Sequence, residues 1–197
     1  MNYAEQLYQK IWKTKGSRFI AHKRLENLNQ LSNYSIAVNS IYVIVLSVLS
    51  LEQFQDMSKL DSNSLSILTL FLSVLIIVIS VIESSKSYKA KAESQHQCGK
   101  ELNKIYERLI QIKNNYNTDN NVIEEVNELG IEYQNIIDKY PENHLTLDFK
   151  RFLLENNETK DKKGFALFWL WLQTYILVLL SMMLPLLFIL FFVIKLS

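Results

Sequence analysis

The feature that most constrains this chain is the separation of its charged residues from its apolar ones. All 41 charged side chains lie outside three uncharged runs, Asn27–Leu51, Ser62–Ile82 and Gly164–Ile194, which hold 25, 21 and 31 residues. A soluble domain spreads charge along the exposed face of every helix or strand, so this separation predicts an integral membrane protein. The longest stretch outside the runs, residues 83–163, is too short for a large soluble enzyme domain.

The three runs predict three membrane-spanning helices. A helix of about 20 apolar residues crosses a bilayer, and Ser62–Ile82 has this length, with 14 of its 21 residues being Leu, Ile, Val or Phe. The first run begins with polar residues, so its membrane part is predicted as Ser35–Leu51. The third run is longer and carries aromatic residues at both ends, as interfacial belts do. Inside it, Pro185 cannot donate to the carbonyl of Ser181, which predicts a kink.

Basic residues near the spans predict the orientation. Six lie in residues 1–26 and one in the loop 52–61, four follow the second span, five precede the third, and only Lys195 lies beyond it. Because basic residues gather on the cytoplasmic side, we expect a cytoplasmic N-terminus, a long cytoplasmic segment and a C-terminus outside.

The segment between the second and third spans contains two apolar stripes at helical spacing. Their members step by four and three residues: Cys98, Leu102, Ile105, Leu109, Ile112 and Tyr116, then Val122, Val126, Leu129, Tyr133, Ile136 and Tyr140. Such stripes indicate helices packed along their length. A helical hairpin turning at Asn117–Asn121 is the simplest arrangement, and a homo-oligomeric coiled coil is the alternative. The candidates for a partner or oligomer interface are Leu102, Ile105, Leu109, Ile112, Val126, Leu129, Tyr133 and Ile136.

These observations predict an all-α membrane protein in four segments. They are a basic amphipathic cytoplasmic helix (1–26), a two-span transmembrane hairpin (27–83), a cytoplasmic helical hairpin with its linker (84–163), and a C-terminal transmembrane helix (164–197). The first helix either lies on the anionic inner leaflet or packs on the cytoplasmic hairpin. Because no proline or glycine lies between Leu65 and Gln97, the sequence allows the second span to run unbroken into the cytoplasm as far as Gly99, as one stiff helix.

Polar residues align on one face of each of the first two spans. The candidates are Ser66, Thr69, Ser73 and Ser80 in the second span, and Asn39, Ser40 and Ser47 in the first. One interpretation is that these small polar residues form helix–helix contacts. The other is that they line a water-filled path in an oligomer. No charged residue lies in any span, which argues against a proton relay or a voltage sensor.

The sequence carries no pattern typical of catalysis, cofactor binding or metal binding. Its four glycines are isolated, so no phosphate-binding loop is present. Its histidines and single cysteine do not form a ligand set at metal-binding spacing. Residues 83–163 carry 13 basic and 15 acidic side chains, so nucleic-acid binding is not expected. We therefore expect a protein that is not an enzyme and needs neither cofactor nor metal.

The layout and a set of local residues resemble the SLATT domain, a bacterial two-transmembrane effector module of nucleotide-signalling conflict systems. The resemblance covers residues ~5–155. The residues that carry it are Trp12, Thr14, Arg18, Ala21, Arg24 and Leu25, then Tyr88, Ala92, His96, Cys98 and Leu102, and finally Tyr133–Ile137, Glu142–His144, Asp148 and Phe149. The third span, Phe165–Ile194, departs from the two-span pattern.

The resemblance implies a membrane effector of bacterial antiviral defence by abortive infection. Such an effector would reside in the inner membrane, contact lipid, assemble as a homo-oligomer, and permeabilise or depolarise the membrane when triggered. Its implied cytoplasmic partner is a nucleotide-generating enzyme or a reverse transcriptase. The alternative from another class is a non-conducting anchor or scaffold that recruits a soluble defence or signalling enzyme.

Overall fold

The computed structural model describes residues 3–49, 62–114, 120–156 and 163–196, and within these ranges the chain is helical apart from residues 86–87 and 140–145. The helices are α1 (Tyr3–Leu49), α3 (Ser62–Ser85), α4 (Tyr88–Asn114), α5 (Asn120–Lys139), α6 (Thr146–Asn156) and α7 (Lys163–Leu196). The described part of the chain contains no strand, which confirms the predicted all-α class.

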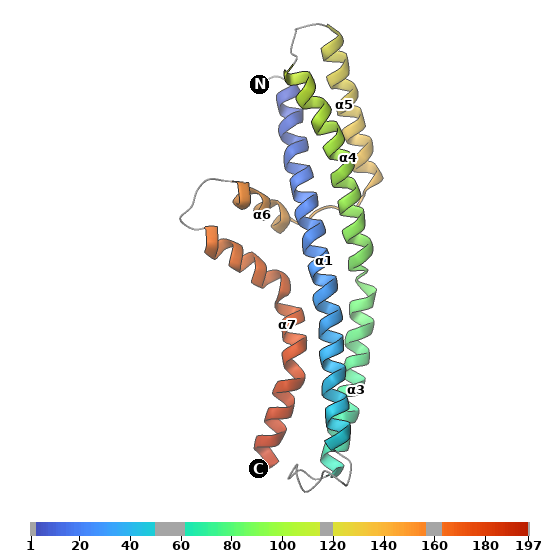
Figure 1. Cartoon of the computed structure of the whole chain (residues 1–197), viewed down its shortest axis with the longest axis vertical. Coiled ribbons are helices and arrows are strands. Elements are labelled where there is room, and N and C mark those ends of the chain that lie inside the picture. The colour runs from blue at the N-terminus through green and yellow to red at the C-terminus, as the bar shows by residue number, and fades with distance from the viewer. Residues whose placement is uncertain (1–2, 50–61, 115–119, 157–162, 197) are drawn as a thin grey trace. The chain divides into compact units, whose positions relative to one another are not determined.

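The helices form two compact units (Figure 1). Unit 1 comprises residues 1–26 and 88–171, and unit 2 comprises residues 27–87 and 172–197. Two helices, α1 and α7, contribute residues to both units. The units are described separately below.

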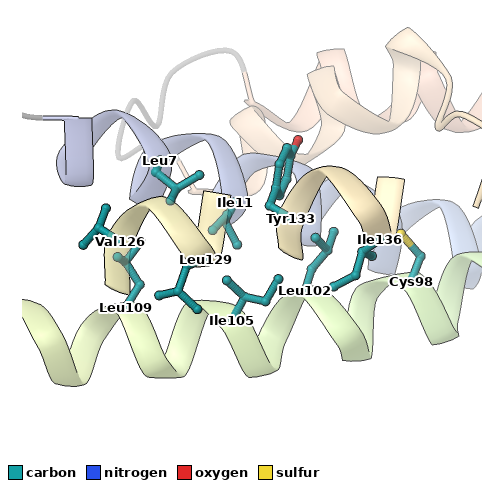
Figure 2. Close-up of a cluster of buried hydrophobic side chains, with 10 residues drawn as sticks. All are labelled: Leu7, Ile11, Cys98, Leu102, Ile105, Leu109, Val126, Leu129, Tyr133 and Ile136. Carbon is teal, nitrogen blue, oxygen red and sulfur yellow. The ribbon is translucent and has the colours of Figure 1, made fainter. Parts of the chain in front are cut away.

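Unit 1 is built on the hairpin of α4 and α5, which α1 covers (Figures 1 and 2). Its core consists of one apolar face from each helix, with the members Leu7, Ile11, Cys98, Leu102, Ile105, Leu109, Val126, Leu129, Tyr133 and Ile136. Burying one such leucine or isoleucine side chain contributes about 1.5–3 kcal/mol. The first helix therefore packs on the hairpin, which is the second of the two arrangements considered for it, because its Leu7 and Ile11 close the core.

The prediction of one helix running from the second span into the cytoplasm is wrong. The α3 helix ends at Ser85, and Ser87 has a φ of 50°, in the left-handed region. The amide nitrogens of Lys86 and Ser87 bond to carbonyls three residues earlier, those of Glu83 and Ser84. The hydroxyl of Ser85 also donates to a carbonyl of the preceding turn. The helix therefore ends at a non-glycine residue in the left-handed region, and no proline marks the break.

Unit 2 brings together residues 27–49 of α1, the α3 helix, and residues 172–196 of α7. The side chains that α1 buries in this unit step by four, three and four residues: Leu28, Ser32, Ser35 and Asn39. Those buried from the other two helices are Leu68, Leu72, Tyr175, Val178 and Pro185. The part of α1 in unit 2 therefore packs through a face that is mainly polar.

Within the described residues, two helices are long and apolar enough to cross a membrane. One of these stretches is Ser66–Lys113, which runs from α3 across residues 86–87 into α4, and the other is Gly164–Leu187 in α7. Only 11% and 24% of their most apolar windows are buried, which suits lipid-facing helices better than the core of a soluble protein. The α1 helix holds most of the first predicted span. Its predicted span, Ser35–Leu51, ends outside the described residues and stays a prediction.

Candidate functional site

The first group of candidate residues lies where α1 meets α7 inside unit 2. The hydroxyl oxygens of Ser35 and Ser181 are 2.8 Å apart. The amide nitrogen of Asn39 donates to the backbone carbonyl of Ser181 at 3.3 Å. Because Pro185 has no N–H, that carbonyl has lost its usual partner one turn further along the helix. Asn39 therefore bonds to the backbone group that the proline leaves unpaired.

This contact pairs only the amide nitrogen of the Asn39 side chain. Its side chain has an exposed fraction of 0%, and its Oδ1 atom has no hydrogen-bond partner among the described residues. A buried acceptor without a partner costs about 1–3 kcal/mol. The α1–α7 contact is therefore specific in its geometry but incomplete in its hydrogen bonding.

Two further polar contacts involve residues nearer the start of the unit 2 part of α1. The amide nitrogen of Asn27 donates to the hydroxyl of Tyr175 at 3.3 Å. The hydroxyl of Ser32 donates to the carboxylate of Glu83 at 2.9 Å, and Lys86 forms an ion pair with the same carboxylate. Sequence reasoning did not single out Glu83. The sequence feature that could have identified Glu83 is its position: it is the first charged residue after the second uncharged run, and a lysine follows three residues later.

The other two candidates on α1 bond to their own helix. The hydroxyl of Ser40 donates to the carbonyl of Ile36 at 2.9 Å, and that of Ser47 donates to the carbonyl of Val43 at 2.8 Å. Ser40 is half-buried and Ser47 is exposed. The polar face of the first run is thus divided, with Asn39 turned to α7 and these two serines bonded to the backbone of α1.

The polar stripe of α3 lies at the edge of unit 2. Ser66 is exposed, whereas Thr69, Ser73 and Ser80 are half-buried. The hydroxyl of Ser73 donates to the carbonyl of Leu70 in the same helix at 2.7 Å. The fully buried side chains of α3 are leucines, Leu68 and Leu72, next to the stripe. A pore-lining or interface role for the four polar residues stays a prediction.

The candidates on the α4–α5 hairpin are packed inside unit 1 of a single chain (Figure 2). Seven of the eight are buried: Leu102, Ile105, Leu109, Val126, Leu129, Tyr133 and Ile136. The eighth, Ile112, is partly buried against the same core. Their contacts are with α1 and with each other, and a role in binding a partner or a second copy stays a prediction.

An ion pair that the sequence did not reveal holds α6 on α1 in unit 1. Arg24 donates from Nε and Nη2 to the two carboxylate oxygens of Asp148, at 2.8 and 3.1 Å. The exposed fraction of Asp148 is 0%. The backbone N–H of Leu145 also donates to this carboxylate at 2.9 Å, which caps the first turn of α6. Both residues of the pair carried the family resemblance, but nothing in their spacing indicated that they meet.

A close aromatic contact reinforces this docking of α6. The rings of Phe152 and Trp12 meet edge to face with their centroids 4.7 Å apart. A Cβ atom added to Gly16 would overlap the Phe152 ring. Glycine at this position therefore lets the ring approach the backbone of α1.

Burial shifts the titration of several groups in unit 1. Desolvation lowers the pKa of His96 and of His144, and the positive charges of Lys100 and of Arg18, respectively, add to the effect. Desolvation raises the pKa of the Cys98 thiol. The neutral forms of these two histidines and of the thiol are therefore favoured near pH 7. Over the described ranges, no group of three or more His, Cys, Asp or Glu side chains is arranged to hold a metal ion.

Comparison with known proteins identifies a family. The family model described as SMODS and SLOG-associating 2TM effector domain family 5 matches residues 1–191. None of the curated proteins and none of the solved structures gives a significant match.

Proposed function

This chain belongs to the SMODS and SLOG-associating 2TM effector domain family, and from that premise we propose that it permeabilises or depolarises the membrane as a homo-oligomer. The family and the two apolar helices make it an all-α membrane protein with an effector role in conflict systems. The proposal adds the mechanism, which is the assembly of polar helix faces from several copies around a water-filled path.

The observation that carries the proposal is the position of the polar stripe on α3. Ser66 is exposed and Ser73 is half-buried, while Leu68 and Leu72 occupy the centre of unit 2. The hydroxyl of Ser73 already donates within its own helix, but acyl chains offer its oxygen no donor, whereas a second copy or a column of water does. The stripe thus lies where another copy can reach it without unpacking the leucines.

The incomplete bonding of Asn39 supports the same proposal. Its buried Oδ1 has no partner among the described residues, so a rearranged state in which a second chain donates to this atom gains a hydrogen bond. Interhelical hydrogen bonds in membranes are worth about 0.6 kcal/mol on average and up to about 1.7 kcal/mol. Contributions of this size favour assembly when several copies contribute them together.

We further propose that the N-terminus and unit 1 lie in the cytoplasm of a bacterial cell and that the C-terminus lies outside the inner membrane. Basic residues before the first span and around unit 1 support this orientation. A cytoplasmic partner, such as a nucleotide-generating enzyme or a reverse transcriptase, would then act on unit 1 to trigger assembly in antiviral defence. The competing function is a non-conducting anchor that holds such an enzyme at the membrane.

The test replaces the two stripe serines that are seven residues apart. Ser73→Leu with Ser80→Leu should abolish membrane depolarisation after controlled expression, because leucine removes the hydroxyl groups from the proposed path. Membrane potential is followed with a voltage-sensitive dye, and insertion is checked by resistance of the membrane-bound protein to alkaline extraction. Ion flux from vesicles containing the purified protein provides the second readout.

The matched control is Val74→Leu with Val81→Leu, which has the same spacing on a neighbouring face that is 53% and 64% exposed. This control should depolarise cells as the wild type does. Equal depolarisation by the serine double variant and the wild type would refute a path along this face. No depolarisation or vesicle flux by the wild type, even when its partner is coexpressed, would instead favour the anchor.

A further inference from the structure

Arg18 places a positive charge inside unit 1 without an acidic partner. Its side chain has an exposed fraction of 0%. The Nη1 atom donates to the side-chain oxygen of Gln95 at 3.0 Å and also to the backbone carbonyl of Glu142. Both acceptors are uncharged. An arginine side chain keeps its charge at physiological pH, and a buried charge needs a counterion to offset its desolvation.

The opposite edge of the same guanidinium group, formed by Nε and Nη2, makes no hydrogen bond among the described residues. Neither Nε nor Nη2 of Arg18 has a hydrogen-bond partner or contact with solvent in the described part of the chain. Arg24, six residues further along α1, uses these same two atoms to bind both oxygens of Asp148. Both arginines therefore carry the same pair of donor atoms, Nε and Nη2, but only those of Arg24 bind a carboxylate.

The neighbouring groups do not supply the missing negative charge. The carboxylate of Asp148 already accepts three hydrogen bonds, two from Arg24 and one from Leu145. Burial raises the pKa of the Cys98 thiol, which keeps it protonated although Arg18 acts in the opposite direction. The buried charged side chains in the described part of unit 1 are two arginines and one aspartate, so one positive charge has no buried counterion.

A second unpartnered donor or acceptor lies on the segment beside Arg18. The Nδ1 atom of His144 is buried and has no hydrogen-bond partner among the described residues. His144 lies close enough to Arg18 for that charge to lower its pKa. It belongs to residues 140–145, the non-helical connection from α5 to α6 that Figure 1 shows passing beside α1. Gln95 also donates to the Glu142 carbonyl at 2.9 Å, so this segment closes over the arginine.

We propose that the Nε–Nη2 edge of Arg18, together with Nδ1 of His144, is a binding site for an oxyanion, a phosphate or carboxylate group bound through two of its oxygens. The planar fork of arginine matches two oxygens of such a group at about 2.7–2.9 Å. The anion reaches the fork when the 140–145 segment moves away from α1. Binding of the anion therefore shifts the 140–145 segment from its position packed on α1 to one displaced from it.

The test measures binding to the full-length protein in detergent micelles at constant ionic strength. The probes are sodium phosphate and sodium acetate, with sodium chloride as the reference. We expect one of the two oxyanions to raise the unfolding temperature saturably, by about 5–10 °C at a hundredfold excess over its dissociation constant. A response to phosphate alone identifies a phosphate site, and a response to acetate alone identifies a carboxylate site.

Arg18→Lys retains the charge but removes the fork, so it should weaken oxyanion binding at least tenfold. Lys13→Gln, which changes an exposed residue of the same helix, should bind as the wild type does. If the lysine variant does not fold, hydrogen exchange in the wild type decides, because ligand must alter exchange in residues 140–148. No saturable response to either oxyanion, an equal response in Arg18→Lys, or unchanged exchange in that segment would overturn the proposal.

Discussion

Replacing Asp148 with alanine leaves the Arg24 guanidinium buried in unit 1 without its acid. The structure gives the number of interactions lost: two hydrogen bonds from Arg24, at 2.8 and 3.1 Å, and one from the Leu145 amide at 2.9 Å. Breaking a buried ion pair by removing one partner costs about 3–5 kcal/mol, mostly because the remaining charge stays desolvated. In a chain of 197 residues, 1 kcal/mol corresponds to about 2–4 °C, so the unfolding temperature should fall by about 6–20 °C.

The assay is thermal unfolding of the full-length protein in detergent, followed by intrinsic fluorescence, with the double variant Arg24→Met, Asp148→Leu as the control. Removing both charges relieves the desolvation penalty, so the double variant should recover at least half of the loss. The reasoning that this pair docks α6 would be refuted if Asp148→Ala lowered the unfolding temperature by less than 2 °C. It would also be refuted if the double variant were no more stable than Asp148→Ala.

Three further predictions concern packing, the membrane contact and pH. Gly16→Ala should destabilise unit 1 by about 1–3 kcal/mol because its methyl group overlaps the Phe152 ring; adding Phe152→Leu should recover most of that loss in the same unfolding assay. Asn39→Leu removes the donor to the Ser181 carbonyl and should cost about 1 kcal/mol or less, measured by unfolding in mixed micelles; a loss above 3 kcal/mol would contradict it. Because the folded pKa of His144 lies below the ordinary value of 6.5, the unfolded state binds more protons below that pH. Stability should therefore fall as pH drops from about 7 toward the folded pKa, and His144→Gln should flatten that slope.

Much of the local organisation follows from the sequence alone. The apolar steps of four and three residues from Leu102 to Ile112 and from Val126 to Tyr140 predict the helices α4 and α5, and the uncharged runs predict the apolar helices α3 and α7. These signals are periodic and local, so every turn of the helix repeats them. The break at Ser87 escaped prediction because no proline or glycine marks it.

The pairings that define the candidate sites required the tertiary structure. Arg24 meets Asp148 across 124 residues, and Asn39 meets the Ser181 carbonyl across 142. Hydropathy and charge spacing along the chain do not specify such contacts, because they depend on which helix faces come together. The sequence by itself determined where the chain is apolar and, apart from the break at Ser87, which of these regions are helical. Only the packing of the helices decided which buried polar groups are paired, and that Arg18 and Asn39 keep atoms without a hydrogen-bond partner among the described residues.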